Sequence, residues 1–137
     1  MAPKRPSKKG LVIMRGILAA SALIIGPAGR WRDSLCVLLQ ATNAIAGILQ
    51  ADDGRSGWQL IVKSRPTLLL LDAGLPGDEA WPLLEQVRKL RPPVRCIVLA
   101  RTSAQAQRAE AAGADAVLQV GFSGKDLYAA IREVCCE

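Results

Sequence analysis

One carboxylate in this chain stands where a folded sheet could use it for chemistry. Residues 67–72 are a threonine, four consecutive leucines and Asp72, and a Gly-Leu-Pro-Gly turn occupies residues 74–77. Four consecutive leucines predict a strand that is buried on both faces, as in the interior of a parallel sheet. In open α/β sheets, ligands bind just beyond the carboxyl ends of the strands. Asp72 is therefore the first candidate for chemistry, although an aspartate in this place can also simply cap the turn.

Other reactive residue types are scarce. The chain has no histidine, which excludes histidine-dependent triads, histidine general bases and histidine-ligated metals. Its four cysteines show no Cys-x-x-Cys spacing, and Cys36 and Cys96 fall on apolar patterns typical of a core. The adjacent Cys135 and Cys136 could respond to redox conditions or could simply end a helix. No phosphate-binding glycine loop or nucleophile–base pair is present, so the sequence does not predict an independent enzyme.

Composition predicts one α/β domain with an unevenly charged start. The chain has 137 residues, of which 50% are hydrophobic and only 4% aromatic, and it carries a net charge of +6. Such a length suits one domain, and an aliphatic core suits layered helices and strands. Residues 1–15 contain five of the 18 lysines and arginines and no acid, which leaves 13 bases and 12 acids in the remainder. We expect a basic, disordered tail over residues 1–16 and a domain over residues 17–137.

The first 25 residues resemble a signal peptide or a short membrane anchor, because a basic stretch precedes an apolar one. Arg15 interrupts the apolar run, which is shorter than the roughly 20 residues that a spanning helix needs. Residues 22–25 also serve well as a first buried strand. We therefore expect no membrane span, a cytoplasmic location and reduced cysteines.

Apolar spacing predicts strands and helices in strict alternation. Strands are expected at 22–25, 44–49, 68–71, 94–99 and 116–120. Helices are expected at 30–40, from the turn at 52–54 through 62 with an end at 65–66, from 78 or 79 to 90, at 104–112 and after Ser123. Ser103 and Ser123 are predicted N-caps, and Pro82 fits only the first turn of its helix. Alternation of this kind predicts a parallel sheet with helices on both faces.

Residues 17–135 resemble the receiver domain of bacterial response regulators. The resemblance rests on residues 65–72 with Leu75-Pro76-Gly77, on 112–118 (Ala-Gly-Ala-Asp-Ala-Val-Leu) and on 51–54 (Ala-Asp-Asp-Gly). It implies a flavodoxin-like, doubly wound sheet of five parallel strands in the order 2-1-3-4-5. It also implies that Asp72 matches the residue that accepts a phosphoryl group from a partner histidine kinase.

Other positions of the family's site carry different residues in this chain. The resemblance implies a pair of acids that help to hold Mg²⁺ after the first strand, a threonine or serine at the end of the fourth strand and a lysine at the end of the fifth. This chain has Gly26-Pro27, Ala100 and Val120 at those positions. Phosphoryl transfer depends on a metal ion and on cationic donors directed at the developing charge. Loss of one such donor typically costs about 3–4 kcal/mol of transition-state stabilisation. We expect no cofactor, with Mg²⁺ bound through Asp72 only if that residue is phosphorylated.

The resulting prediction is a stand-alone, degenerate receiver-like domain that acts through protein contacts with little or no phosphorylation. Its expected partner is a histidine kinase or an effector protein that binds the face formed by the last two helices and the fifth strand. A homodimer through this face is also considered. Candidate surface residues lie on the last two helices and are Gln105, Gln107, Arg108, Lys125, Tyr128 and Arg132. One alternative is a working phosphoacceptor that uses Asp72. Another is weak, non-specific association of the basic tail with nucleic acid or an anionic membrane.

Overall fold

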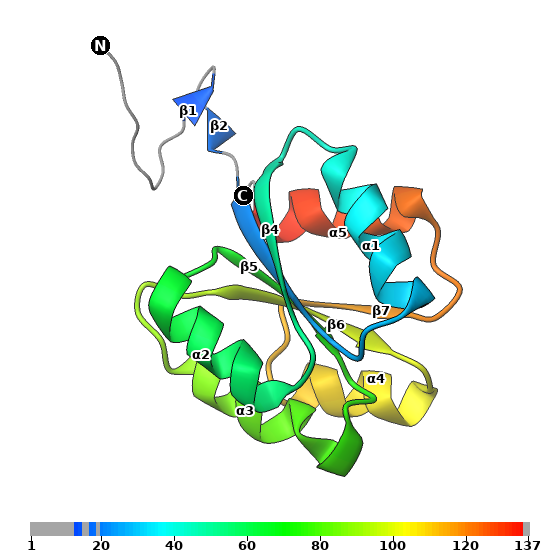
Figure 1. The fold of residues 1–137 in the computed structure, drawn as a ribbon. Helices are drawn as coiled ribbons and strands as arrows, with labels where there is room; N and C mark the ends of the chain where they lie inside the picture. Colours follow the sequence, from blue (N-terminus) through cyan, green and yellow to red (C-terminus); the bar gives the residue numbers. More distant parts are fainter. Residues whose placement is uncertain (1–12, 15–16, 19, 136–137) are drawn as a thin grey trace.

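Five parallel strands form the main sheet of the protein (Figure 1). The computed structural model describes residues 13–14, 17–18 and 20–135. The sheet strands are β3 (Ala20–Ile25), β4 (Ile45–Ala51), β5 (Leu68–Asp72), β6 (Arg95–Ala100) and β7 (Ala116–Gln119). They lie in the order β4-β3-β5-β6-β7, with every neighbouring pair parallel. Counted along the chain, this is the predicted order 2-1-3-4-5, so the predicted fold class is confirmed.

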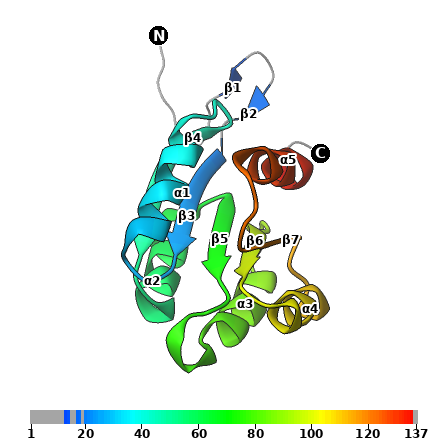
Figure 2. The ribbon, with the colours of Figure 1, turned by 90° about the vertical axis from the view of Figure 1, so that its right-hand side faces the viewer.

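Helices cover both faces of this sheet. The helices are α1 (Arg30–Gln40), α2 (Gly54–Ser64), α3 (Ala80–Arg88), α4 (Ser103–Ala111) and α5 (Gly124–Cys135), with a 3-10 turn η1 (Pro76–Asp78) before α3. Buried side chains of α1 and α5 join one core cluster, whereas those of α2, α3 and α4 join the other. Figure 2 shows the same division, with the sheet between the two groups of helices.

The leucine strand β5 lies at the centre of the sheet and is buried on both faces, as predicted. Leu69 and Leu71 belong to the core under α2, α3 and α4, whereas Leu68 and Leu70 belong to the core under α1 and α5. All five residues of β5 are buried. Full burial of one leucine side chain stabilises the fold by about 1.5–3 kcal/mol. The strand that carries Asp72 is therefore held rigidly by both cores.

Of the two predicted N-caps, Ser123 is confirmed and Ser103 is wrong, and Asp53 supplies a cap that was not predicted. The Asp53 carboxylate caps α2 by accepting from the Ser56 N–H, and the Ser123 hydroxyl accepts from the Asp126 N–H at the start of α5. The prediction that Ser103 caps the fourth helix is wrong. The cap is Thr102, whose hydroxyl accepts from the Gln105 N–H, and the helix begins at Ser103 itself. Thr102 and Ser103 both carry a hydroxyl, but Thr102 has the extended backbone of an N-cap residue.

Two short strands precede the main sheet. β1 (Ile13–Met14) pairs antiparallel with β2 (Ile17–Leu18) in a separate two-stranded sheet. This pairing spans the boundary predicted between the tail and the domain, and most of the predicted tail lies outside the described residues. None of the helices in the described part of the chain is long and apolar enough to cross a bilayer.

Candidate functional site

Asp72 ends β5 at the carboxyl edge of the sheet, where the sequence places the candidate site. Its side chain is only 1% exposed. Oδ1 accepts a hydrogen bond from the Gly74 N–H across 2.8 Å, and Oδ2 accepts one from Nη2 of Arg101 across 3.3 Å. A buried carboxylate needs such partners because desolvation without them is costly. Each oxygen of Asp72 is thus already engaged within the protein.

Arg101 is the functional candidate that the sequence reasoning missed. It directly follows β6, and its guanidinium forms the ion pair with Asp72 while its side chain stays 50% exposed. Its Cζ also lies 5.7 Å from the centroid of the Trp31 ring, within the range of a cation–π contact. The backbone N–H of Arg101 donates to the Gln105 side chain across 2.8 Å. The available signal was an arginine immediately after a strand that neighbours β5.

Gly26 lies directly beside the carboxylate of Asp72. A Cβ at this position would lie 3.2 Å from the Asp72 Cβ, 3.5 Å from its Oδ2 and 3.6 Å from the Trp31 ring. The first of these distances is tighter than ordinary van der Waals contact. A carboxylate in place of Gly26 would therefore have to displace Asp72 or Trp31. The neighbouring Pro27 is exposed and carries no ligand atom on its side chain.

A second arginine binds the oxygens at the ends of β3 and β4. Nη1 of Arg32 donates to the backbone oxygens of Gly26 (2.9 Å) and Ala51 (3.1 Å) and to Oδ1 of Asp52 (2.7 Å). The Arg32 side chain is only 12% exposed, and its Nε is buried without a hydrogen-bond partner. This arrangement places a fixed positive charge at the edge where the resemblance implies acids. The Asp52 carboxylate therefore already forms an ion pair with Arg32.

The remaining positions of the expected site carry no group that could assist phosphoryl transfer. Ala100 is fully buried at the end of β6, and Val120 is 50% exposed after β7. The two are joined through the backbone, where the Val120 N–H donates to the Ala100 oxygen. The nearby Thr102 hydroxyl caps α4. The cation that the structure places on Asp72 is Arg101, which also lies over Trp31, whereas Arg32 binds the neighbouring strand ends.

The residues at this edge do not fit an octahedral Mg²⁺ site. Mg²⁺ requires near-ideal octahedral oxygen coordination and is usually held by one or two carboxylates with several waters. Asp72 is the carboxylate at the predicted position, and one of its oxygens already pairs with a guanidinium. Among the described residues, no three histidine, cysteine, aspartate or glutamate side chains gather closely enough to hold a metal ion. A divalent cation would also have to displace or lie beside the Arg101 charge.

Comparisons with known proteins identify the family. The family model of the response regulator receiver domain matches residues 23–132. The chain belongs to this family. Receiver domains are generally non-enzymatic signalling domains that interact with histidine kinases and effector domains.

Individual relatives of this receiver domain are distant. The Fimbriae Z protein of Salmonella typhimurium is 28% identical over 117 residues, which cover 84% of this chain and 56% of that protein. The transcriptional regulatory protein HprR of Escherichia coli is 33% identical over 81 residues, which cover 58% of this chain and 36% of that protein. The chain thus spans about half the length, or less, of these two relatives.

Solved structures share the fold of this receiver domain. A LuxR-family two-component response regulator from Aurantimonas sp. SI85-9A1 superposes with a TM-score of 0.77 at 20% identity, covering 86% of each chain. A CheY-like response regulator receiver domain protein from Methanospirillum hungatei JF-1 superposes with a TM-score of 0.73 at 26% identity, covering 84% of this chain and 92% of that one.

The predicted partner-surface residues of the receiver domain have different environments. Gln107, Arg108, Lys125 and Arg132 are exposed. Gln105 is half-buried and binds the Arg101 backbone, and the Arg108 guanidinium stacks 4.8 Å from the Trp81 ring centroid. Tyr128 is also half-buried, and its hydroxyl donates to the Leu38 oxygen in α1. Four of the six residues therefore offer accessible side chains, and the partner surface stays a prediction.

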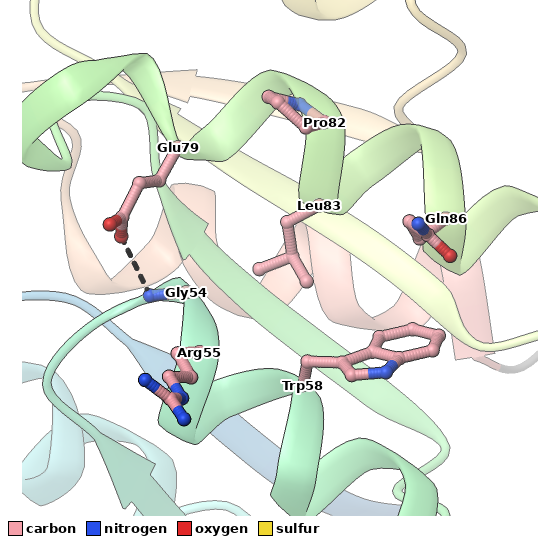
Figure 3. Close-up of a pocket in the computed structure, with 7 residues that line it drawn as sticks. All are labelled: Gly54, Arg55, Trp58, Glu79, Pro82, Leu83 and Gln86. Atoms are coloured by element: carbon pink, nitrogen blue, oxygen red, sulfur yellow. Dashed lines mark hydrogen bonds between the residues drawn. The ribbon is translucent and has the colours of Figure 1, made fainter.

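A hollow of about 300 Å³ opens between α2 and α3 (Figure 3), and none of the six partner-surface residues lines it. The Trp58 and Leu83 side chains face it, and at one end the Gly54 N–H donates to Oε1 of Glu79 across 2.9 Å. The full lining is Gly54, Arg55, Trp58, Glu79, Pro82, Leu83 and Gln86. Asp72 is not among the lining residues, so this hollow is separate from the receiver site.

Two cysteines lie in the cores of the receiver domain, as predicted. Cys96 in β6 is fully buried, and burial raises the pKa of its thiol far above the ordinary value. Burial is also the main cause that raises the pKa of the Cys36 thiol in α1. Thiolate is the reactive form of cysteine, so both thiols are expected to be inert in the folded protein. Cys136 lies outside the described residues, and a redox role for Cys135 and Cys136 stays untested.

Proposed function

We propose that this receiver domain signals through protein contacts that do not depend on phosphorylation of Asp72. The observation that carries the proposal is the ion pair between Asp72 and Arg101. The guanidinium supplies the buried carboxylate with positive charge from within the chain. Asp72 is then a structural partner of Arg101 and not a phosphoacceptor.

The contacts of Asp72 oppose phosphoryl transfer for two reasons. Both carboxylate oxygens are weakened as nucleophiles, since Oδ1 accepts from the Gly74 N–H and Oδ2 accepts from the Arg101 guanidinium. The reaction also needs a cation that bridges the carboxylate and the phosphoryl oxygens, and Arg32 and Arg101 disfavour a divalent ion at this edge. Guanidinium groups could neutralise charge on a phosphoryl group, but they cannot replace the missing oxygen ligands of a metal.

A conformational switch driven by phosphorylation would also lack the side chains that bind the phosphate. Ordering of a segment by a phosphate requires new hydrogen bonds to that phosphate. Ala100 carries no hydroxyl, and Val120 carries no charge. The surface of α4, β7 and α5 is therefore expected to hold one conformation, and we assign partner binding to this surface. The proposed partner is a histidine kinase or an effector protein, contacted by Gln107, Lys125 and Arg132.

The deciding experiment treats the purified protein with a small phosphodonor, with and without Mg²⁺, and measures intact mass. The matched control is Asp72→Asn, which keeps the side-chain shape. A third sample, Arg101→Ala, removes the competing guanidinium. We expect no Mg²⁺-dependent adduct on the wild type.

Each result of this experiment has one meaning. A metal-dependent adduct on the wild type that is absent from Asp72→Asn overturns the proposal and establishes the working phosphoacceptor. No adduct on the wild type supports it. An adduct on Arg101→Ala alone also supports it and identifies Arg101 as the group that blocks the reaction.

A further inference from the structure

The outer edge of β4 is an unprotected edge of the main sheet. β4 is the first strand in the sheet order, and no strand of the described part of the chain pairs with its outer side (Figure 1). Residues 34–51, which include most of α1 and all of β4, contain no Asp, Glu, Lys, Arg or Pro. Proteins usually protect such edges with charges, proline, bulges or short strands. The opposite edge strand, β7, has four residues, whereas β4 has seven.

The direction of the free backbone groups follows from one hydrogen bond. The Ala51 oxygen accepts from the Gly26 N–H, so it points toward β3. Backbone groups of successive strand residues point to alternate sides. The N–H and C=O groups of Ile48 and Gln50 therefore point outward, whereas those of Leu49 and Ala51 point toward β3. From Gly47 to Ala51 the register with β3 is regular, and the one irregularity lies before Gly47.

Apolar side chains accompany this edge. In the described part of the chain, four large aliphatic side chains are exposed, and three of them lie on β4 or on the helices that contact it: Leu49 (39% exposed), Val37 on α1 and Val62 on α2. Leu49 pairs in register with Leu23, so it lies on the α2 face of the sheet. It belongs to neither core cluster.

We propose that a second copy of this chain pairs antiparallel with β4, with the twofold axis at Leu49. Ile48 of each copy then lies opposite Gln50 of the other, and each such pair exchanges two backbone hydrogen bonds. The two Leu49 side chains meet as a close cross-strand pair. The two sheets join into one continuous sheet across the interface.

Charge distribution favours a second copy over a charged partner. The edge itself is uncharged, so it is complementary to an identical edge. Asp52 and Asp53 follow the end of β4, and the Asp52 side chain stays 70% exposed although it pairs with Arg32. Lys63 lies in the last turn of α2 and Arg65 follows that helix, near the start of β3. Antiparallel pairing brings the acidic end of one copy toward the basic end of the other. The interface is small, so the dimer is expected to depend on concentration.

Sedimentation over a range of concentrations tests the dimer with two matched variants. Leu49→Lys places two like charges opposite each other and is expected to raise the dissociation constant at least ~10-fold. Val120→Lys makes the same change at the opposite edge of the sheet and is expected to leave the constant unchanged. Circular dichroism of the dilute variants confirms folding, which Leu49→Lys should retain because Leu49 is outside both cores.

Amide hydrogen exchange tests the register. Raising the concentration should protect the amides of Ile48 and Gln50 and leave those of Leu49 and Ala51 unchanged. A wild-type protein that stays monomeric at NMR concentrations overturns the proposal. So does a dimer that survives Leu49→Lys, or one that dissociates in Lys125→Glu, which would place the interface on the α4, β7 and α5 surface. These outcomes are independent of whether Asp72 is phosphorylated.

Discussion

Nη2 of Arg101 donates to Oδ2 of Asp72 across 3.3 Å, and these two residues join the carboxyl ends of neighbouring strands β5 and β6. The pair is asymmetric, because the aspartate is 1% exposed and the arginine is 50% exposed. If the ion pair is lost, water can solvate the exposed arginine side chain, whereas it cannot reach the buried aspartate carboxylate.

This asymmetry predicts unequal costs for the two single substitutions. Arg101→Ala leaves a buried carboxylate with only the Gly74 N–H and should lower the free energy of unfolding by about 1–2 kcal/mol. Asp72→Asn should cost less, because its amide oxygen can still accept from Gly74. Urea unfolding of both variants and of the double variant measures the coupling. Additive effects of the two substitutions would contradict a direct interaction.

Restoring the missing groups should restore phosphorylation. We expect Pro27→Asp, Ala100→Ser and Val120→Lys, combined with Arg101→Ala, to give a Mg²⁺-dependent phosphoryl adduct detected by intact mass. Position 27 is the better place for the acid, since a side chain at Gly26 would crowd Asp72. The same variant with Asp72→Asn serves as the control and should show no adduct. If the folded variant gives no adduct in the presence of Mg²⁺, the groups absent from the wild type are not what prevents phosphorylation of Asp72.

The fold could be predicted from the sequence because the determining signals are local. The leucine run 68–71 predicts a strand buried on both faces, and the Gly and Pro residues at 26–27, 66, 74–77, 92–93 and 113 predict where several elements end. Strand bounds differed from the predicted ones by only one or two residues. The N-cap at Thr102 was missed because the adjacent Ser103 carries the same functional group.

The contacts of Asp72 could not be predicted in the same way. Arg101 lies 29 residues from Asp72, and its approach depends on the lengths of β5 and β6 and on their register. The family resemblance directed attention to Val120 as the position of the missing cation, whereas the cation comes from the end of the neighbouring strand. Arg32 likewise binds oxygens 6, 19 and 20 residues away, which only the assembled strand ends bring together.

Gly57 allows α2 to approach β3 closely. A Cβ at this position would lie 2.3 Å from Cδ1 and 2.8 Å from Cγ1 of Ile25. Alanine normally stabilises a helix by about 1 kcal/mol relative to glycine, but crowding in a packed core costs about 1–3 kcal/mol. Gly57→Ala is therefore expected to be destabilising in urea unfolding. Gly47→Ala is the control, since its Cβ would meet open space, and it should not lower stability.

Asp53 makes the stability of α2 sensitive to acid. The Ser56 N–H, followed by the Ser56 hydroxyl, donates to this carboxylate and lowers its pKa below the ordinary value of 3.8. A lowered pKa in the folded state gives stability that is present above pH 3.8 and is lost as the pH falls through the folded value. Asp53→Asn keeps a capping oxygen but cannot titrate. Thermal unfolding between neutral and acid pH should therefore show a smaller acid loss for Asp53→Asn than for the wild type, and equal losses would contradict the assignment.

Cys96 should make the protein less stable in alkali. Burial raises the pKa of its thiol above the ordinary value of 9.0, so the unfolded chain loses this proton before the folded chain does. The stabilising contribution is fully present below pH 9.0 and declines as the pH rises above it, by up to about 1.4 kcal/mol per pH unit. Cys96→Ala lowers the free energy of unfolding at every pH because it removes packed atoms from the core, but it also removes the thiol that titrates. The difference between the two proteins in unfolding free energy should therefore narrow from pH 8 to pH 10 in urea titrations, and a constant difference would show that the thiol titrates alike in both states.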